Sequence, residues 1–387
     1  MPEHPALIAA WARSAVAPHG GAFRSLQPHQ IAAPVIAALL QRAGLQAQAV
    51  DALVVGNALG AGGNPARMLA LAAGLPQRCA SYSVDTQCCS GLDAVTLAVG
   101  LLASSQAQVV IAGGVEAWSR APLRQHRPLR AGEPAIAYER PAFAPDPTQD
   151  PDLLESAAHY AAQQGITRLQ QDAYAVQSHH KAVAHQDELA DEIVEILGLS
   201  YDPYPRAISQ EKAARMPVAA HPHTAHPTQE CAVSSLAISA RADGAAFVLL
   251  ATRQACQALG LHPHAAWVAS SSVGAEPSMP LLAAEQAARA VLLRAGLASV
   301  HNIATTELHD AFAVQGLDFC QALGLNPARI NRRGGGISRG HPIGASGAIA
   351  LVRLLADLQR DEAAGAKGLT AVAGAGGIGA AAIVQRL

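Results

Sequence analysis

The chain has 387 residues, of which 50% are hydrophobic and 14% are charged, and its formal net charge is −2. At roughly 100–200 residues per domain, this length predicts about two or three structural units. The small charge and the absence of a polybasic run argue against a surface for nucleic acid or anionic membranes. No apolar stretch reaches the ~18–20 residues that a membrane span requires.

Two further features of the sequence point to a reducing cytoplasm. Residues 1–5 contain no charged segment leading into an apolar one, so no secretory signal is expected. The six cysteines form neither a disulfide spacing pattern nor a CxxC pair, which argues against a disulfide scaffold and a zinc site. Free thiols and no bound metal are therefore expected.

Apolar strands alternate with helices in the first 118 residues. Strands are predicted at 6–12, 50–56, 80–84 and 108–114, and helices at 29–44, 64–74 and from about 88 to 104. This alternation predicts a mostly parallel sheet covered by helices on both faces.

Residues 119–229 break this pattern and are interpreted as a long inserted loop domain. They hold many of the prolines, much of the charge and several histidines of the chain. Helices are predicted near 152–163 and 168–186. The remainder, such as 141–151 and 219–227, is predicted to be loop.

The pattern of the first part then returns. Residues 245–250 read as a strand, and later elements are predicted as a helix at 284–296, a strand at 304–308, a glycine-rich turn at 334–347, a helix at 346–359 and a strand at 369–373. Because Ser90-Gly91 and Ser346-Gly347 each open a helix that leads to a strand ending in glycines, an internal duplication is indicated. The predicted halves are residues 1–118 with 230–255, and residues 256–387.

Cys88 lies where a strand ends and a helix begins, in Asp85-Thr86-Gln87-Cys88-Cys89-Ser90-Gly91-Leu92. A helix N-terminus carries a partial positive charge and free N–H donors, which can lower a cysteine pKa and hold an oxyanion. The alternative interpretation is a small buried apolar residue, as most free cysteines are.

His341 lies within Gly340-His341-Pro342-Ile343-Gly344-Ala345-Ser346-Gly347, an irregular turn just before a helix. A phosphate-binding glycine loop is excluded because no Lys-Ser or Lys-Thr pair follows. A histidine held by a rigid glycine turn suits a fixed general base.

Two weaker motifs complete the set. His309-Asp310-Ala311-Phe312 ends a strand, where His309 is either part of a polar turn or a group that positions a water or donates to a carbonyl oxygen. Gly374-Ala375-Gly376-Gly377 is either a tight strand connection or a source of backbone N–H groups for an oxyanion.

In this order and spacing, the motifs resemble those of the thiolase family. Cys88 falls in its Cys-x-Ser-Gly-Leu motif, Ala112-Gly113-Gly114-Val115-Glu116 matches Ala-Gly-Gly-Met-Glu, His309-Asp310-Ala311-Phe312 matches Asn-Glu-Ala-Phe, and the most specific match is Gly340-His341-Pro342-Ile343-Gly344. The resemblance implies an α/β fold of two similar halves with a five-layered α/β/α/β/α core, a homodimer or homotetramer, and a coenzyme A thioester as substrate without a permanently bound cofactor.

The resemblance also implies roles for individual residues. Cys88 would take the acyl group and His341 would deprotonate it. His309 would stand where the family's asparagine orients a water of one oxyanion hole. The backbone N–H groups of Cys88 and Ala375 would form the other. Ser239, Phe312 and Gly377 would contact the substrate.

Several positions depart from the family pattern. The second catalytic cysteine of thiolases corresponds to Ala373, and the alternative position of that cysteine corresponds to Ala311. Cys89 is a poor substitute because the next residue on a helix points ~100° away. Substitutions at 152–154, 237–239 and 279–282 predict a reshaped pocket.

Three functions follow from these observations. The first is a thiolase-like C-acyltransferase that works by a ping-pong mechanism through acyl-Cys88 and makes or cleaves 3-oxoacyl thioesters. The second is a specialised biosynthetic acyltransferase with a pre-activated acceptor. The third is a non-catalytic acyl-binding or partner subunit. Loss of the second cysteine affects carbon–carbon chemistry more than acyl loading, which needs only nucleophile, base and oxyanion hole.

Overall fold

The computed structural model describes residues 6–60, 62–222 and 229–387, so the predicted lack of a signal at residues 1–5 lies outside the described residues. The described α-helices are α1 (Pro28–Ala43), α2 (Pro65–Ala72), α3 (Ser90–Ala103), α4 (Leu153–Gln164), α5 (Arg168–Ala184), α6 (Gln210–Ala214), α7 (Arg253–Leu259), α8 (Ala283–Arg294), α9 (Ala313–Leu323), α10 (Gly336–Arg339) and α11 (Ser346–Asp361). The described strands are β1 (Leu7–Ser14), β2 (Ala17–Pro18), β3 (Ala52–Gly56), β4 (Ala80–Val84), β5 (Val109–Ala117), β6 (Arg124–His126), β7 (Ile136–Tyr138), β8 (Ile193–Val194), β9 (Val218–Ala220), β10 (Val233–Ser234), β11 (Ala242–Ala251), β12 (Ala265–Gly274), β13 (Thr305–His309), β14 (Lys367–Gly374) and β15 (Ile378–Arg386).

The main strands form one continuous sheet in the order β13-β14-β15-β12-β1-β11-β5-β3-β4. Parallel pairing joins β3 to β4 and β5, and β13 to β14, whereas β5–β11, β11–β1, β14–β15 and β15–β12 are antiparallel. The prediction of a mostly parallel sheet is therefore wrong. One reason is that the three-residue turn between β14 and β15 is too short for the crossover that parallel strands need.

The sheet consists of two matching halves that meet at β1 and β12. In the first half, β3 is parallel to β5, β5 is antiparallel to β11, and β11 is antiparallel to β1. In the second half, β13 is parallel to β14, β14 is antiparallel to β15, and β15 is antiparallel to β12. Both inner strands carry a register shift near their start, between Ile8 and Ala10 in β1 and between Trp267 and Ala269 in β12. The repeated topology supports the predicted duplication.

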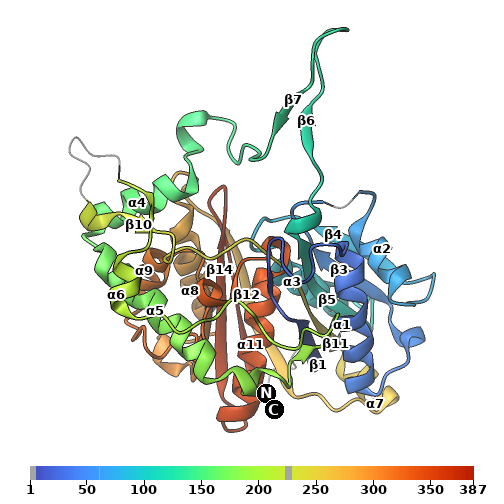
Figure 1. Ribbon diagram of the computed structural model, residues 1–387. Coiled ribbons are helices and arrows are strands. Elements are labelled where there is room, and N and C mark those ends of the chain that lie inside the picture. The colour runs from blue at the N-terminus through green and yellow to red at the C-terminus, as the bar shows by residue number, and fades with distance from the viewer. Residues whose placement is uncertain (1–5, 61, 223–228) are drawn as a thin grey trace.

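Helices cover this sheet in layers (Figure 1). One apolar cluster joins α1 and α2 to the outer face of the first half, and another joins α8 to the outer face of the second half. Between them, a third cluster combines α3 and α11 with the inner faces of both halves. The α/β/α/β/α core predicted from the sequence is thereby confirmed.

The inserted segment lies over one end of the core. The helices predicted near 152–163 and 168–186 are confirmed as α4 and α5, each with a side-chain cap from Asp152 or Thr167. Residues 141–151 are loop with one short 3₁₀ turn. The loop predicted at 219–227 begins within β9, and its residues 223–227 lie outside the described residues.

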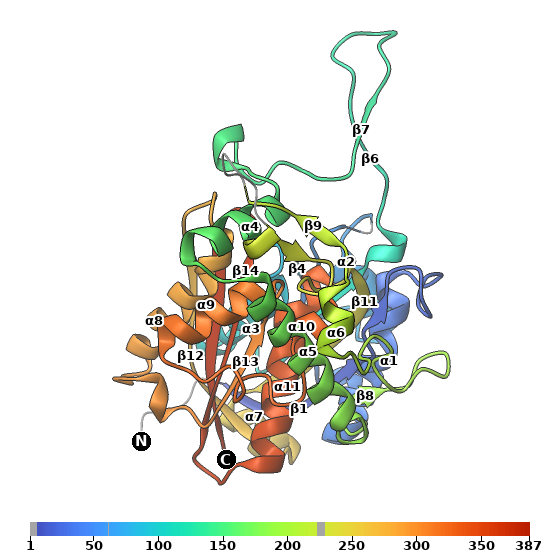
Figure 2. The same ribbon diagram turned by 60° about the vertical axis from the view of Figure 1, so that its left-hand side comes forward.

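A long arm extends from the insertion far beyond the core, as both ribbon views show (Figures 1 and 2). Its two strands, β6 and β7, pair antiparallel. The side chains of Leu123 and Leu129 are 98% exposed and that of Ile136 is 68% exposed. No sequence signal for this hairpin was found, because its strands have only three residues each.

Candidate active site

Cys88 sits in a tight turn between β4 and α3. The preceding residue, Gln87, has φ +53°, a left-handed conformation that is uncommon for a residue other than glycine. The hydroxyl of Ser90 donates to the Gln87 carbonyl at 2.5 Å and accepts from the Thr86 N–H at 2.9 Å. These bonds hold the turn and thereby fix the direction of the Cys88 side chain.

His341 is brought to this turn by the loop between α10 and α11. Its N–H donates to the Ala240 carbonyl at 2.7 Å, and its carbonyl accepts from Trp118 Nε1 at 3.0 Å. The residue before it, Gly340, has φ +116°, which a side chain would disfavour. The histidine backbone is therefore tied to the first half of the molecule on both sides.

The two side chains meet, as the sequence predicts for a nucleophile and its base. Cys88 Sγ lies 3.1 Å from His341 Nε2, and His341 Nδ1 lies 2.7 Å from Ser346 Oγ. The Ser346 hydroxyl donates its only hydrogen to the Pro342 carbonyl at 3.0 Å. In the contact between His341 and Ser346, the proton is therefore on His341 Nδ1. This tautomer leaves the Nε2 lone pair facing the thiol.

Burial keeps this pair neutral at rest. It raises the pKa of the Cys88 thiol to about 12, with backbone N–H groups of Ala375 and Cys88 opposing the rise. It also lowers the pKa of His341 to about 4. A helix N-terminus can lower a cysteine pKa, but here desolvation outweighs the N–H groups and the pKa of the thiol is raised. A thiolate would form only as His341 takes the proton.

The N–H groups predicted for an oxyanion lie beside the sulfur. Ala375 belongs to the turn between β14 and β15, and its N–H is directed at the Cys88 thiol. The following residues, Gly376 and Gly377, have φ +82° and +74°. A Cβ on Gly377 would come within 2.6 Å of the Ala275 carbonyl oxygen, so this turn packs too closely for a larger residue.

His309 lies against His341 at the end of β13. Their ring centroids are 4.4 Å apart, and His309 is only 3% exposed. Burial, the neighbouring His341 and Arg339 hold the pKa of His309 well below its ordinary value. Among the described residues, its Nε2 atom has no hydrogen-bond partner. The neutral ring thus offers one free nitrogen at the site.

Asp310, the next residue, is fully buried and does not form a solvent-exposed polar turn. Its carboxylate accepts from the Tyr174 hydroxyl at 2.8 Å and from the Ile337 N–H at 3.3 Å. Burial raises the pKa of this carboxyl group. Asp310 therefore links the inserted helix α5 to the loop that leads to His341.

The His341 loop is also anchored from the first half, through Glu116. This buried carboxylate accepts from the N–H groups of Gly344 at 3.0 Å and Ala58 at 2.9 Å, and from Asn57 Nδ2 at 2.7 Å. Burial raises the pKa of Glu116 to about 7, although the N–H groups act in the opposite direction. The carboxylate thus joins the ends of β3 and β5 to the base-bearing loop.

Glycines make this junction possible. Those of β3, α3 and β5 converge on the carbonyl oxygen of Gly344. A Cβ on Gly56 or Gly91 would lie 2.7 or 2.8 Å from that oxygen, and one on Gly114 would lie closer still. Contacts this short cannot accommodate a side chain, which explains why glycine recurs in three separate motifs.

The predicted substrate residues lie beside the loop rather than on the sulfur. Ser239 donates its hydroxyl to the Gly336 carbonyl at 2.6 Å, and Phe312 is buried in an apolar cluster with α4, α5 and α9. Their described contacts do not include Cys88. The same cluster contains members of all three segments that depart from the family pattern, including Leu153, Ala237 and Leu281.

Cys89 is separated from the catalytic pair, as its position on the helix predicts. It is fully buried, and its Sγ contacts the carbonyls of Val372 at 3.6 Å and Ile378 at 3.7 Å. Burial raises its pKa well above the ordinary value. Cys89 therefore packs as an apolar residue against the second half.

Sequence reasoning missed Ser346, Glu116 and Asn57 as parts of this site. Ser346 was noted only as the first residue of a helix, although a hydroxyl five positions after a histidine in a tight turn could have suggested the contact. Glu116 was noted only as a motif position, and nothing in the sequence indicated the role of Asn57.

The described residues contain no group of three or more histidine, cysteine, aspartate or glutamate side chains that could hold a metal ion. In that part of the chain, no helix is both long and apolar enough to cross a membrane.

Comparison with known proteins was made on both sequence and structure. The model of the thiolase N-terminal domain matches residues 6–254, and that of the thiolase C-terminal domain matches residues 261–386. Relatives include an acetyl-CoA acetyltransferase of Rhizobium meliloti, 35% identical over 98% of each chain, and a putative acetyl-CoA C-acetyltransferase of Bacillus subtilis, 34% identical over 95% of each.

Solved structures agree with this assignment. The acetyl-CoA acetyltransferase of Bacillus anthracis superposes with a TM-score of 0.89 at 31% identity, covering 100% of this chain and 99% of that one. A thiolase of Ascaris suum in complex with coenzyme A superposes with a TM-score of 0.88 at 27% identity, covering 99% of this chain and 100% of that one. The chain therefore belongs to the thiolase family of acyltransferases.

Proposed function

We propose that the protein is a C-acyltransferase that forms or cleaves 3-oxoacyl-CoA by a ping-pong mechanism through acyl-Cys88. The observation that carries this proposal is the 3.1 Å contact between Cys88 Sγ and His341 Nε2, with the Nδ1 proton directed to Ser346. Relatives named as acetyl-CoA acetyltransferases support coenzyme A thioesters as substrates rather than resident cofactors.

In the first half-reaction, Cys88 attacks the thioester carbonyl as His341 Nε2 takes the thiol proton. The carbonyl oxygen becomes an oxyanion that the N–H groups of Cys88 and Ala375 are placed to receive. When the intermediate collapses, the carbon–sulfur bond to coenzyme A breaks, and His341 returns the proton to the leaving thiolate. Acyl-Cys88 and neutral His341 remain.

In the second half-reaction of synthesis, a base must remove an α-proton from the acceptor thioester. No thiol stands at Ala373 or Ala311. After the first step, His341 is neutral again, and His309 lies beside it with a free Nε2. We propose that this histidine pair removes the α-proton from the acceptor thioester. The resulting carbanion attacks the acyl carbon, the bond from that carbon to Cys88 Sγ breaks, and the released thiolate takes the proton back from the histidine pair.

The same alanines favour a second candidate function, in which the acceptor is already nucleophilic. Acyl loading needs only Cys88, His341 and the N–H groups, whereas abstraction of an α-proton gains about 10²–10⁴-fold from a positioned base. An acceptor that needs no such step would bypass the missing thiol. The close contact between Cys88 Sγ and His341 Nε2 argues against the third hypothesis, a non-catalytic subunit.

Acyl loading is tested by intact mass after incubation with acetyl-, butyryl- and octanoyl-CoA, with Cys88→Ala as control. An adduct of the acyl mass is expected on the wild type and absent from the control. Absence of an adduct with every donor, from folded protein, would overturn both enzymatic proposals.

The two acceptor chemistries are separated by exchange of the methyl protons of acetyl-CoA in D₂O. Carbon–carbon chemistry predicts exchange that depends on Cys88 acylation and on His309. Rapid loading without any exchange, and without thiolysis of 3-oxoacyl-CoA, would leave the pre-activated acceptor as the function.

We further propose a homodimer or homotetramer acting in the cytoplasm, with domain boundaries as predicted from the sequence. The edge strand β4 supports an assembly, because its Tyr82 is 46% exposed and its unpaired edge invites another strand. The arm supports a second contact through its exposed Leu123 and Leu129. Light scattering should show that Tyr82→Asp is a monomer and that Leu129→Asp forms nothing larger than a dimer. A monomeric wild type would refute the assembly.

A further inference from the structure

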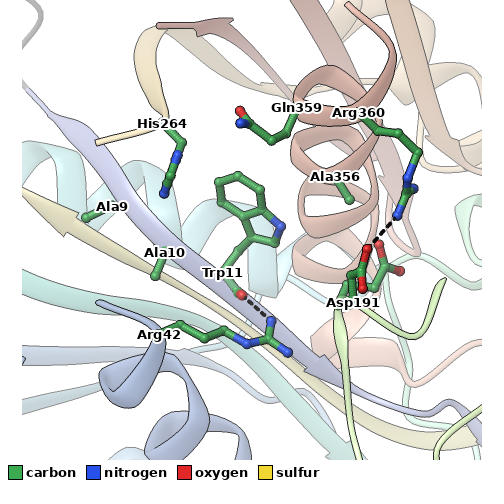
Figure 3. A pocket seen from close by; sticks show the side chains of 10 residues that line it. Ala9, Ala10, Trp11, Arg42, Asp191, His264, Ala356, Gln359 and Arg360 are labelled. Carbon is green, nitrogen blue, oxygen red and sulfur yellow. Dashed lines mark hydrogen bonds and ion pairs between the residues drawn. The ribbon is translucent and has the colours of Figure 1, made fainter. Parts of the chain in front are cut away.

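A cavity lies beside Ala356, Gln359 and Arg360, near the C-terminal end of α11 (Figure 3). Its volume is about 420 Å³, within the ~300–1,000 Å³ range of small-molecule sites. The first residue of α11, Ser346, contacts His341, whereas Gln359 near its end lines the cavity. At ~1.5 Å per residue, these positions are about 20 Å apart, so the cavity is separate from the thiol site.

The cavity is located where three parts of the chain meet. Its walls come from β1 and α1 of the first half, from α11 of the second half, and from the turn at Asp191 and Glu192 in the insertion. Among the described strands, β12 pairs with β1 only as far as Ile8 and β8 joins it only from Arg13, so Ala9, Ala10 and Trp11 line the cavity along the open strand edge between them.

One wall of the cavity is suited to a flat apolar group. The indole of Trp11 is partly exposed and stands between His264 and Gln359 (Figure 3). The His264 ring meets it edge to face at 5.6 Å and 79°. The neighbouring Ala356 has a small side chain that leaves space beside the indole. An aromatic ligand ring could pack against Trp11 in this space.

The charged groups of the lining leave one cation available. Asp191 pairs with Arg360 at 3.3 Å, and Glu192 is held by Arg13 and Arg353. Arg42 donates Nη1 to the Trp11 carbonyl at 2.8 Å; among the described residues it makes no close ion pair, although Glu192 and Asp191 attract its charge from farther away. Its remaining N–H donors match a single carboxylate in a fork-like contact.

We propose that this cavity binds a small aromatic monocarboxylate, with its ring against Trp11 and its carboxylate on Arg42. The charge of the lining supports a single negative group, because Arg42 is the one lining arginine without a close ion pair among the described residues. Since the ligand would contact all three parts of the chain, its binding should also stabilise the folded protein. The proposal does not depend on which acyl transfer the protein performs.

The test is a calorimetric and fluorescence titration of the full-length protein with benzoate and indole-3-carboxylate. Saturable binding is expected for at least one of them, and benzamide should bind more weakly because it lacks the charge. Arg42→Met should raise the dissociation constant about tenfold to a hundredfold, since a charge-assisted hydrogen-bond pair is lost. Arg42→Lys, which keeps the charge without the fork, should fall between.

Matched controls locate the binding. Arg294→Met removes another arginine that donates to a backbone carbonyl, that of Ser270 at 3.0 Å, and should leave the dissociation constant unchanged. Trp11→Phe should abolish the fluorescence change, because the ligand contacts Trp11 and not Trp118 or Trp267, whose emission remains. Heat should still be released on binding. Cys88→Ala should bind the carboxylate as the wild type does, and saturating coenzyme A should not displace the carboxylate. Arg42→Met should still acquire the acyl adduct on Cys88.

Three results would overturn the proposal. They are the absence of saturable heat with either carboxylate at millimolar concentration, a dissociation constant for Arg42→Met within twofold of the wild type, and displacement by coenzyme A. Circular dichroism identifies any unfolded variant. If Arg42→Met does not fold, equal binding of benzoate and benzamide by the wild type is the refuting result.

Discussion

The two halves of the molecule share one framework but end differently. Beyond β3, the first half adds the edge strand β4, whose side chains are all exposed or only partly buried. Beyond β13, the second half has no further paired strand among the described residues, and β13 itself is buried along its whole length. Asp310, α9 and the loop of α10 follow it instead.

This difference separates assembly from chemistry. The exposed end of the first half is free for another copy, whereas the buried end of the second half holds His309, Asp310 and the His341 loop in one packed unit. The nucleophile comes from the first half and its base from the second. The two halves of the repeated framework thus share a single site, to which each half contributes one residue of the catalytic pair.

The largest effect should come from the base that the second half supplies. Replacing His341 by alanine leaves the Cys88 thiol without an acceptor for its proton, and burial holds its pKa at about 12. The rate of acylation should fall about 10²–10⁴-fold, as followed by rapid quenching and intact mass. A rate within threefold of the wild type would show that the halves do not divide the chemistry in this way.

The contact between the halves should be broken by Gly344→Ala. The new Cβ would lie 2.6 Å from Asn57 Cα and 2.9 Å from Glu116 Oε2. Overpacking of this kind costs about 1–3 kcal/mol of unfolding free energy, measured by urea denaturation. The matched variant Gly100→Ala has open space at its Cβ within α3 and should gain about 0.5–1 kcal/mol. Equal effects at the two glycines would contradict the proposed tight junction.

The role of Ser346 as a positioning residue is tested by Ser346→Ala. Loss of one neutral hydrogen bond should slow acylation about threefold to tenfold, because Nδ1 of His341 no longer has its acceptor. Ser346→Thr keeps the hydroxyl and should recover most of the rate. If alanine and threonine behave alike, the hydroxyl does not orient the histidine.

The smallest effect is expected from pH. Because burial lowers the pKa of His341 to about 4, the imidazole is the neutral base at every pH well above that value. The acylation rate should change less than about twofold between pH 6 and 8 and fall tenfold per unit below about pH 4. Stopped-flow pH-jump measurements would show the inflection, and one near pH 6.5 would mean that His341 is solvated.

Much of the fold was predictable because its elements carry strong periodic signals. The apolar spacing of Ile31, Val35 and Leu39 predicted α1, and all three are fully buried. The strands β12 and β15 went unassigned because they are rich in alanine, serine and glycine, which have little strand preference. The antiparallel pairing of β14 with β15 followed from turn geometry that the residues alone did not specify.

The site was partly predictable for a different reason. Cys88, His341, His309 and Ala375 lie at ends of elements, where reactive groups and glycines leave recognisable motifs, and the structure places them together. The hydrogen bond from His341 to Ser346 and the carboxylate of Glu116 depend on loop packing. The net pKa of Cys88 also depends on burial, which opposes the helix terminus and has no signature in the sequence.

The central position of β1 has a consequence for biogenesis. Among the described strands β1 is synthesised before all others, yet its partners β11 and β12 follow the whole insertion. At about 5–20 residues per second, β1 waits about ten to fifty seconds for β11. During that interval an apolar strand with two open edges must be kept from pairing with other chains, which is a task for cotranslational chaperones.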